Sequence, residues 1–290
     1  MKSNYRYIVK AFMAMAVIAG TTSCDDFLDR EPMSSISPET YYSTAAQLEA
    51  NLNDEYPNVL PSFGQWTYGI FGEDKGTDNQ IEVNANDRYT QDRWKVPHSE
   101  SDNWKFERIY RINFFLSEAL PKFGEDMSGS QNTISGSVAT IKHYIGEMYF
   151  LRAYEYFKKL QLFGDFPIIN QPLADEMEAL REASKRFPRN EVARFIISDL
   201  DKAYAYMSDV DMATTRINKD AAMLVKSRVA LFEATWLQNF KGTAFVPGGE
   251  GWPGASLHNN YQYPSGNLDN EVKYFLEQAV EASKLVADKY

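Results

Sequence analysis

The sequence feature that most constrains the fold is a long helical pattern between residues 137 and 163. Apolar side chains recur there every three or four positions, and no proline interrupts them. This period places the apolar side chains on one broad side of an α-helix, which other elements must cover. Gly164 and Pro167 then predict the end of the helix, as a C-cap and a breaker. The apolar positions are Val138, Ile141, Ile145, Met148, Leu151, Tyr154, Phe157 and Leu160.

The same period predicts five further helices, separated by long segments rich in glycine, proline and asparagine. The helices are expected at about residues 39–56, 102–120, 189–208, 219–239 and 268–290, with a short extended run at 166–170. Ser37 is expected to cap the first helix with Pro38 in its first turn, Pro57 to begin a loop, and Pro121 with Gly124 to end the second helix.

The starts of the later helices are irregularly spaced along the sequence. That excludes a plain array of ~34-residue tetratricopeptide repeats but fits helix pairs interrupted by insertions. We therefore predict a mainly α chain, built from tetratricopeptide-like helix pairs with long irregular loops.

The N-terminal segment has the pattern of a signal peptide. Three basic residues and no acidic ones precede an apolar run at residues 11–20, and small residues then lead to Cys24, the single cysteine. Ten apolar residues are too few to span a bilayer, which needs about 20. We predict that residues 1–23 are removed and that Cys24 begins the mature chain and carries lipid such as palmitate. The alternative is ordinary secretory cleavage, which would leave a free thiol.

Charge and motifs exclude several classes of function. The chain has 40 acidic and 30 basic residues, a net charge of -10, and no basic stripe, so a nucleic-acid partner is not expected. No nucleophile-elbow, zinc-protease or phosphate-loop motif occurs, and the three histidines lie far apart in the sequence. We therefore predict no catalytic residue, no metal site and no cofactor.

One loop combines aromatic and polar side chains in a way that suits a sugar. Pyranose rings have apolar faces that stack on flat aromatic side chains, and neighbouring amide and guanidinium groups can bind the hydroxyl groups. The alternative is that these aromatic side chains only pack the loop onto the helices; Trp66 and Trp252 are weaker candidates. The candidate ligand-binding residues are Asn86, Arg88, Tyr89 and Trp94.

Three motifs carry a family resemblance. The stretch Asp-Asp-Phe-Leu-Asp follows Cys24, the helix GEMYFLRAYEYF at residues 146–157 leads to a Gly-Asp-Phe-Pro turn, and residues 216–222 precede a further helix. Together they resemble the SusD/RagB family of outer-membrane lipoproteins of Bacteroidetes over essentially the whole chain. Members of that family are usually much longer. Residues 24–290 are therefore expected to be a SusD-like N-terminal α-helical domain, incomplete at the C-terminus.

The middle motif also has a physical interpretation. Glu147 and Arg152 are five residues apart, so they do not face each other as an i,i+4 pair on the helix. We expect each of them to bind other segments and the motif to be architectural.

The resemblance implies a function. It implies a non-enzymatic, lipid-anchored protein of the outer membrane that faces the exterior, captures glycan and delivers it to a TonB-dependent SusC-like transporter. In this family, glycan contacts come partly from loops before the second predicted helix and partly from the C-terminal half. Two alternatives stay open: capture of peptides, which some relatives perform, and a secreted glycan-degrading enzyme or accessory subunit.

Overall fold

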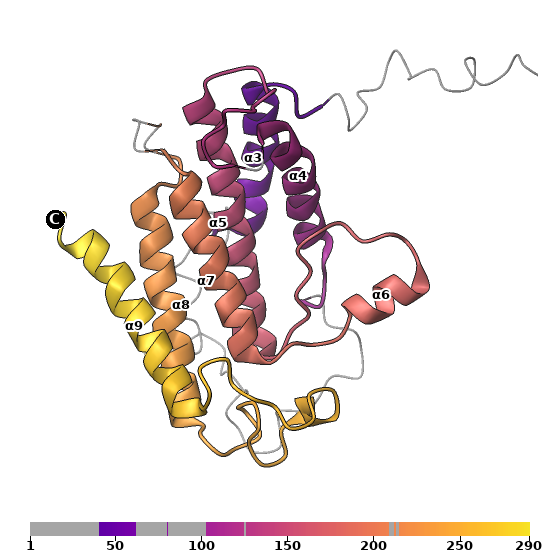
Figure 1. Ribbon diagram of the computed structural model, residues 1–290, viewed down its shortest axis with the longest axis vertical. Coiled ribbons are helices and arrows are strands. Elements are labelled where there is room, and N and C mark those ends of the chain that lie inside the picture. The colour runs from indigo at the N-terminus through magenta and orange to yellow at the C-terminus, as the bar shows by residue number, and fades with distance from the viewer. Residues whose placement is uncertain (1–40, 62–79, 81–102, 125, 209–211, 213–214) are drawn as a thin grey trace, which may run out of the picture. The chain divides into compact units, whose positions relative to one another are not determined.

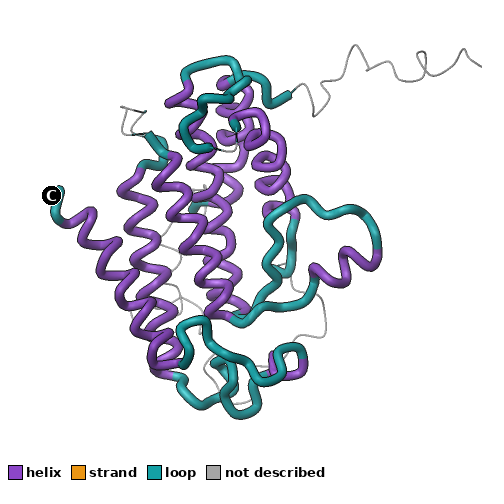
Figure 2. The backbone as a smooth tube through the Cα atoms, viewed as in Figure 1, coloured by secondary structure: helices purple, strands orange, loops and turns teal. Residues whose placement is uncertain are grey.

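A computed structural model describes residues 41–61, 80, 103–124, 126–208, 212 and 215–290. Residues 42–290 form one compact unit. The described residues hold seven α-helices and one 3-10 turn, and no strand, so the predicted mainly α fold is confirmed (Figure 2). The helices are α3 (Ala45–Val59), α4 (Glu107–Phe123), α5 (Val138–Phe163), α6 (Met177–Ala183), α7 (Arg189–Tyr206), α8 (Lys219–Asn239) and α9 (Leu268–Ala287), with the 3-10 turn η3 (Pro253–Ser256).

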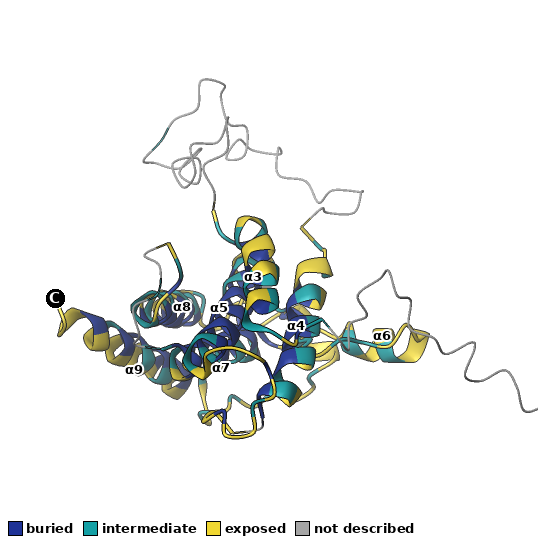
Figure 3. Cartoon of the chain, turned by 90° about the horizontal axis from the view of Figure 1, so that it is seen from above, coloured by how far each residue is buried: buried dark blue, intermediate teal, exposed yellow. Residues whose placement is uncertain are grey.

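Helix α5 is the centre of the unit. On one side α7 packs against it, followed by α8 and then α9, while α3 and α4 cover its other side (Figure 1). The helices α5, α7, α8 and α9 alternate in direction, as expected for successive helix pairs (Figure 1). Figure 3 shows the buried residues concentrated on α5, where Ile141, Ile145, Met148 and Tyr156 are fully buried. This burial explains the unbroken apolar pattern in the sequence.

A glycine sets the closest approach between α5 and α7. A Cβ atom at Gly146 would lie 2.9 Å from the Ala203 carbonyl oxygen and 2.9 Å from atoms of Met207. Contacts of that length are too short for a carbon atom and involve backbone, so a larger residue would push the two helices apart.

The start of the first described helix differs from the sequence prediction. Helix α3 begins at Ala45 rather than near residue 39. Thr44 is its N-cap, and the Thr44 side chain and the Gln47 side chain each accept a backbone N–H of the other, which is a capping box. Ser37 and Pro38 lie outside the described residues.

Two prolines lie inside helices that they were expected to end. Pro57 is in α3 and Pro121 is in α4. Each proline removes one backbone donor, but the next hydrogen bonds still form, from Leu60 N–H to the Tyr56 carbonyl and from Gly124 N–H to the Leu120 carbonyl. Both prolines therefore sit in a last turn that loses one bond and stays helical. Trp104, expected inside the second helix, precedes it.

The remaining helices match the prediction closely. Ser137 caps α5, Gly164 follows it with φ 67°, and α8 covers residues 219–239 as expected. The short helix α6 was not predicted. None of its residues is buried, so it has no apolar stripe for periodicity to detect.

Candidate functional site

The family-like motif on α5 binds other segments through buried charges, as its spacing predicted. The Tyr56 hydroxyl donates to Glu147 Oε2 at 2.8 Å, and the Arg216 guanidinium donates to both Glu147 oxygens at 2.8 and 2.6 Å. His143 Nε2 lies 2.9 Å from Glu147 Oε1 and 3.0 Å from the Ile217 carbonyl, and its Nδ1 accepts the Ser208 N–H. These contacts join α5 to the chain before and after residues 209–214, so His143 has an architectural role.

Arg152 joins α5 to α7 and α4. Its guanidinium donates twice to Asp199, at 2.6 and 2.8 Å, and also to the Asn113 side chain at 2.9 Å. A fourth hydrogen bond reaches the Asn170 carbonyl at 3.2 Å. Because Arg152, Asp199 and Asn113 are all buried, this cluster is part of the architecture and has no access to a ligand.

The structure describes none of the residues that the sequence predicts for lipidation and ligand binding. Cys24, Asn86, Arg88, Tyr89 and Trp94 all lie outside the described residues, as does Trp66. Trp252 is described and is buried, so its indole is not an open sugar platform. Within the parts of the chain that the structure describes, no group of three or more His, Cys, Asp or Glu side chains could hold a metal ion.

One turn of α5 holds the two ends of the segment that contains residues 86–94. Lys158 Nζ donates to the Val59 carbonyl at 2.8 Å, before that segment, and Lys159 Nζ donates to the Asn103 carbonyl at 2.7 Å, after it. Glu155, which is buried, pairs with both lysines at 2.7 and 3.3 Å. The chain therefore leaves and returns beside the same carboxylate.

A pocket of about 680 Å³ opens at the C-terminal end of α5, where the 240–267 segment lies across the helix ends (Figure 1). We call it the aromatic pocket. Its lining combines four aromatic rings with apolar and polar side chains: Phe163, Trp236, Phe245, Trp252, Leu162, Leu257, Gln161, Asp165, Arg186 and Arg189.

Asp165, in the turn after α5, forms hydrogen bonds to two other segments that line the pocket. Its Oδ1 accepts the Arg189 backbone N–H at 2.9 Å, at the start of α7, and its Oδ2 accepts the Trp252 indole N–H at 2.8 Å. Burial raises the pKa of the Asp165 carboxyl, and these hydrogen bonds oppose the rise. The Gly-Asp-Phe-Pro turn thus positions both α7 and the 240–267 segment. The tryptophan partner could not be found from sequence, because it lies 87 residues away.

Two arginines line the aromatic pocket, and they differ in burial and in ion pairing. Arg189 is buried and forms a two-pronged pair with Glu233, with a closest distance of 2.8 Å, and its guanidinium lies 4.1 Å from the centre of the Trp236 ring. Burial raises the pKa of Glu233, and Arg189 opposes the rise. Arg186 is exposed and stacks 4.6 Å from the centre of the Trp104 ring, and it forms no ion pair with any described residue.

Two of the lining rings, those of Trp236 and Phe245, are joined through Phe240. The centres of Trp236 and Phe240 are 4.5 Å apart, and those of Phe240 and Phe245 are 5.4 Å apart. The Trp236 indole donates to the Phe245 carbonyl at 3.0 Å, which fixes the backbone that presents Phe245. The pocket therefore combines a held, flat apolar surface with the side chain of Arg186, which forms no ion pair with any described residue.

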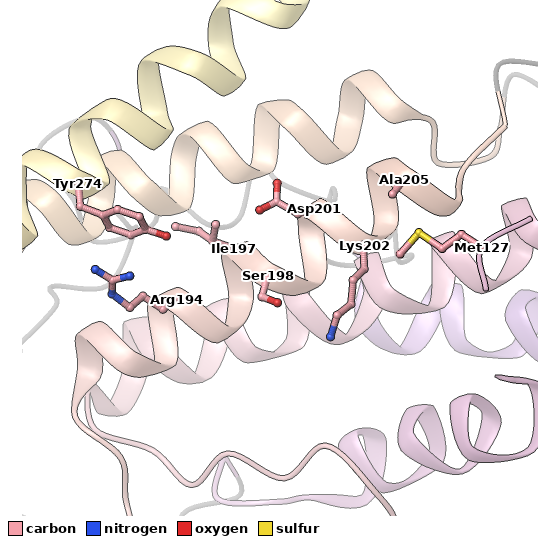
Figure 4. A pocket seen from close by; sticks show the side chains of 8 residues that line it. All are labelled: Met127, Arg194, Ile197, Ser198, Asp201, Lys202, Ala205 and Tyr274. Carbon is pink, nitrogen blue, oxygen red and sulfur yellow. The ribbon is translucent and has the colours of Figure 1, made fainter. Parts of the chain in front are cut away.

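A second hollow, of about 390 Å³, lies between α7 and α9 (Figure 4). Its charged groups already have partners. Arg194 pairs with Glu271 at 2.7 Å and lies 3.7 Å from the centre of the Tyr274 ring, and Asp201 pairs with Lys226 at 2.6 Å. This hollow is the weaker candidate, because a ligand would have to compete with those pairs.

None of the helices in the described part of the chain has both the length and the apolar character needed to cross a bilayer.

Comparison with known proteins places the chain in a family. Residues 26–231 match a SusD-like family described as starch-binding and associating with the outer membrane. Two SusD-like proteins of Formosa agariphila are each 25% identical, over 74% and 83% of this chain and over 41% and 46% of their own lengths. The chain thus spans less than half the length of these curated relatives.

The chain is also similar to solved structures. A SusD-like carbohydrate-binding protein from Bacteroides fragilis superposes with a TM-score of 0.46 and 18% identity, over 69% of this chain and 40% of that one. The family assignment rests on the sequence match, which covers well over half of the chain. By that match, the chain belongs to the SusD-like family of starch-binding, outer-membrane-associated proteins.

Proposed function

We propose that this protein is a lipid-anchored, non-enzymatic protein that faces the exterior of the outer membrane, binds glycan and delivers it to a TonB-dependent SusC-like transporter. The observation that carries the proposal is the family match, which begins at residue 26, two residues after Cys24, and continues to residue 231. The family's description supplies the ligand class and the membrane. Capture of peptides remains the alternative for the ligand.

The lipid anchor depends on Cys24. We expect Cys24→Ala to lower the amount of processed protein in the membrane fraction, since an acyl chain contributes about 0.8 kcal/mol for each buried CH₂ group. Mass spectrometry of the wild-type N-terminus separates this from retention by an uncleaved signal segment. A wild-type chain that is cleaved, soluble and without lipid would refute the anchor.

Binding and turnover separate the proposal from its rivals. The purified protein is incubated with a panel of polysaccharides and with a panel of peptides, and both depletion of the ligand and new reducing ends are measured. We expect glycan binding without new reducing ends. Turnover of glycan would identify the enzyme, and binding of peptides alone would identify a peptide-capturing protein.

Delivery requires a partner in the same membrane. We expect the protein, when gently extracted from outer membranes, to copurify with a TonB-dependent transporter, and we expect loss of either protein to abolish uptake of the bound glycan. Uptake that continues at the wild-type rate without this protein would contradict the delivery role.

The loop with Asn86, Arg88, Tyr89 and Trp94 is the proposed primary contact with the glycan. Its support is the mixture of flat rings with amide and guanidinium groups. The Glu155, Lys158 and Lys159 cluster supports it further, because it fixes the chain on both sides of the segment that holds this loop.

A further inference from the structure

We propose that the aromatic pocket is a second glycan contact, in which one pyranose ring stacks on Phe245 and is bound by the guanidinium of Arg186. This inference rests on the proposed function and deepens it, because it assigns a site in the described part of the chain that is distinct from residues 86–94. Its basis is that one pocket is lined by an exposed aromatic ring, by an arginine that forms no ion pair with any described residue, and by buried side chains that are held by hydrogen bonds.

Phe245 is the stacking surface. The residue is 61% exposed although it lines a pocket, so much of it is open to solvent. Its position is nevertheless held, because its carbonyl accepts the Trp236 indole N–H, its N–H bonds to Thr243 Oγ1 at 3.3 Å, and Phe240 packs edge-on against it. A ring that is already fixed loses little conformational freedom on binding, which favours affinity.

Two exposed leucines line the same pocket as that ring. Leu162, in the last turn of α5, is 58% exposed, and Leu257, after the 3-10 turn η3, is 54% exposed. Single exposed leucines are ordinary on protein surfaces. Here two of them and an exposed phenylalanine line one concavity, and exposed apolar side chains that gather in this way are typical of a ligand site. The volume of about 680 Å³ lies within the range of small-molecule sites, roughly 300–1,000 Å³.

Arg186 provides the polar contact. Its guanidinium has five N–H donors, is stacked on Trp104, and forms no ion pair with a described residue. Asp165 and Arg189 are, in contrast, engaged with Trp252 and Glu233, so they form the floor and are not available to a ligand. A pyranose ring matches this arrangement, since it has one apolar face and a rim of hydroxyl oxygens that accept hydrogen bonds.

Isothermal titration calorimetry with a soluble oligosaccharide that the wild-type protein binds tests the site. Phe245→Leu keeps an apolar side chain and removes the flat ring, and we expect it to weaken binding about tenfold, the factor that corresponds to ~1.4 kcal/mol. Phe245→Tyr keeps the ring and should bind within about twofold of wild type. Leu224→Ala, at a 53% exposed position on α8, is the matched control and should change nothing.

Arg186→Gln tests the polar contact. We expect a loss for every bound oligosaccharide, and a larger loss for those carrying a uronate carboxylate, because charge-assisted hydrogen bonds are roughly twice as strong as neutral ones. Melting curves for each variant should stay within about two degrees of wild type, since both side chains are exposed surface groups.

The outcomes separate this inference from the proposed function. If the wild-type protein binds no oligosaccharide, the proposed function fails. If wild type binds while Phe245→Leu and Arg186→Gln both bind as wild type does, the glycan binds elsewhere and only this site is refuted. If Phe245→Leu and Leu224→Ala weaken binding equally, the effect is general and the stacking contact is also refuted.

Discussion

Removal of the Arg152 guanidinium should destabilise the protein more than removal of any exposed cation. Arg152→Met keeps an apolar side chain of similar length at the centre of α5. It removes two hydrogen bonds to Asp199, one to Asn113 and one to the Asn170 carbonyl. The substitution therefore leaves the Asp199 carboxylate buried without its arginine partner.

The magnitude follows from that uncompensated charge. Breaking a buried ion pair by removal of one partner costs about 3–5 kcal/mol of the free energy of unfolding. Lys202 Nζ lies 3.8 Å from Asp199 Oδ1 on a half-exposed side chain, and it can shift toward the carboxylate in the variant. Because Lys202 can partly compensate the Asp199 charge, the expected loss of unfolding free energy is near the lower end of that range, about 3 kcal/mol. Lys185→Met, which breaks an exposed pair with Glu182, should cost less than about 1 kcal/mol.

Urea unfolding followed by circular dichroism measures both variants. The second arm is the double variant Arg152→Met with Asp199→Asn, in which the buried charge is gone. It should recover at least about 1 kcal/mol relative to Arg152→Met alone, because the penalty comes from the charge left behind and not from lost packing. A double variant no more stable than the single one would refute this reasoning, and so would a single-variant loss below about 1 kcal/mol.

Two further predictions concern the binding loop and acid stability. If the Trp94 ring stacks on sugar, Trp94→Ala should weaken glycan binding by about 1–3 kcal/mol and leave the melting temperature unchanged. If Trp94 is instead a core residue, the substitution should cost about 3–5 kcal/mol of stability and leave binding unchanged. Titration calorimetry and a melting curve on this one variant distinguish the two. Burial acts to raise the pKa of Glu271, but hydrogen bonds from Arg194, Asn190 and Ser265 outweigh it and lower that pKa below 4.5. The stabilisation by the ionised Glu271 is therefore complete above pH 4.5 and is lost as the pH falls through the folded-state pKa. The difference in melting temperature between wild type and Glu271→Gln should accordingly shrink in acid. A difference that is constant with pH would contradict this assignment.

Periodicity predicted the helices that bury a stripe, and it failed where the physical cause was different. Helix α5 was found because it is covered on both sides, whereas α6 buries nothing and left no pattern. The predicted start of α3 is too early, because Ser37 and Pro38 also have the pattern of a helix cap. The sequence also contains Thr44 followed by Gln47 three residues later, a capping-box spacing that could have located the start.

The partners of buried charges could be predicted only in part. The five-residue spacing of Glu147 and Arg152 showed that they do not pair with each other, and each does bind another segment. Their partners, Arg216 and Asp199, lie 69 and 47 residues away. Pairing at that distance depends on how helices pack, so no local pattern could identify it.

The aromatic pocket shows most clearly why a site escapes local reasoning. Its rings come from the end of α5, from α8 and from the 240–267 segment, and they meet because Asp165 binds both the start of α7 and the Trp252 indole. The sequence makes Trp252 a weaker candidate for stacking on sugar, but the indole is buried and hydrogen-bonded to Asp165, whereas Phe245 in the same pocket is exposed. Composition could indicate that aromatic side chains gather in this segment. Only the fold determines which aromatic ring is buried by packing and which one is exposed to solvent. That difference in exposure separates a core residue from a candidate binding residue.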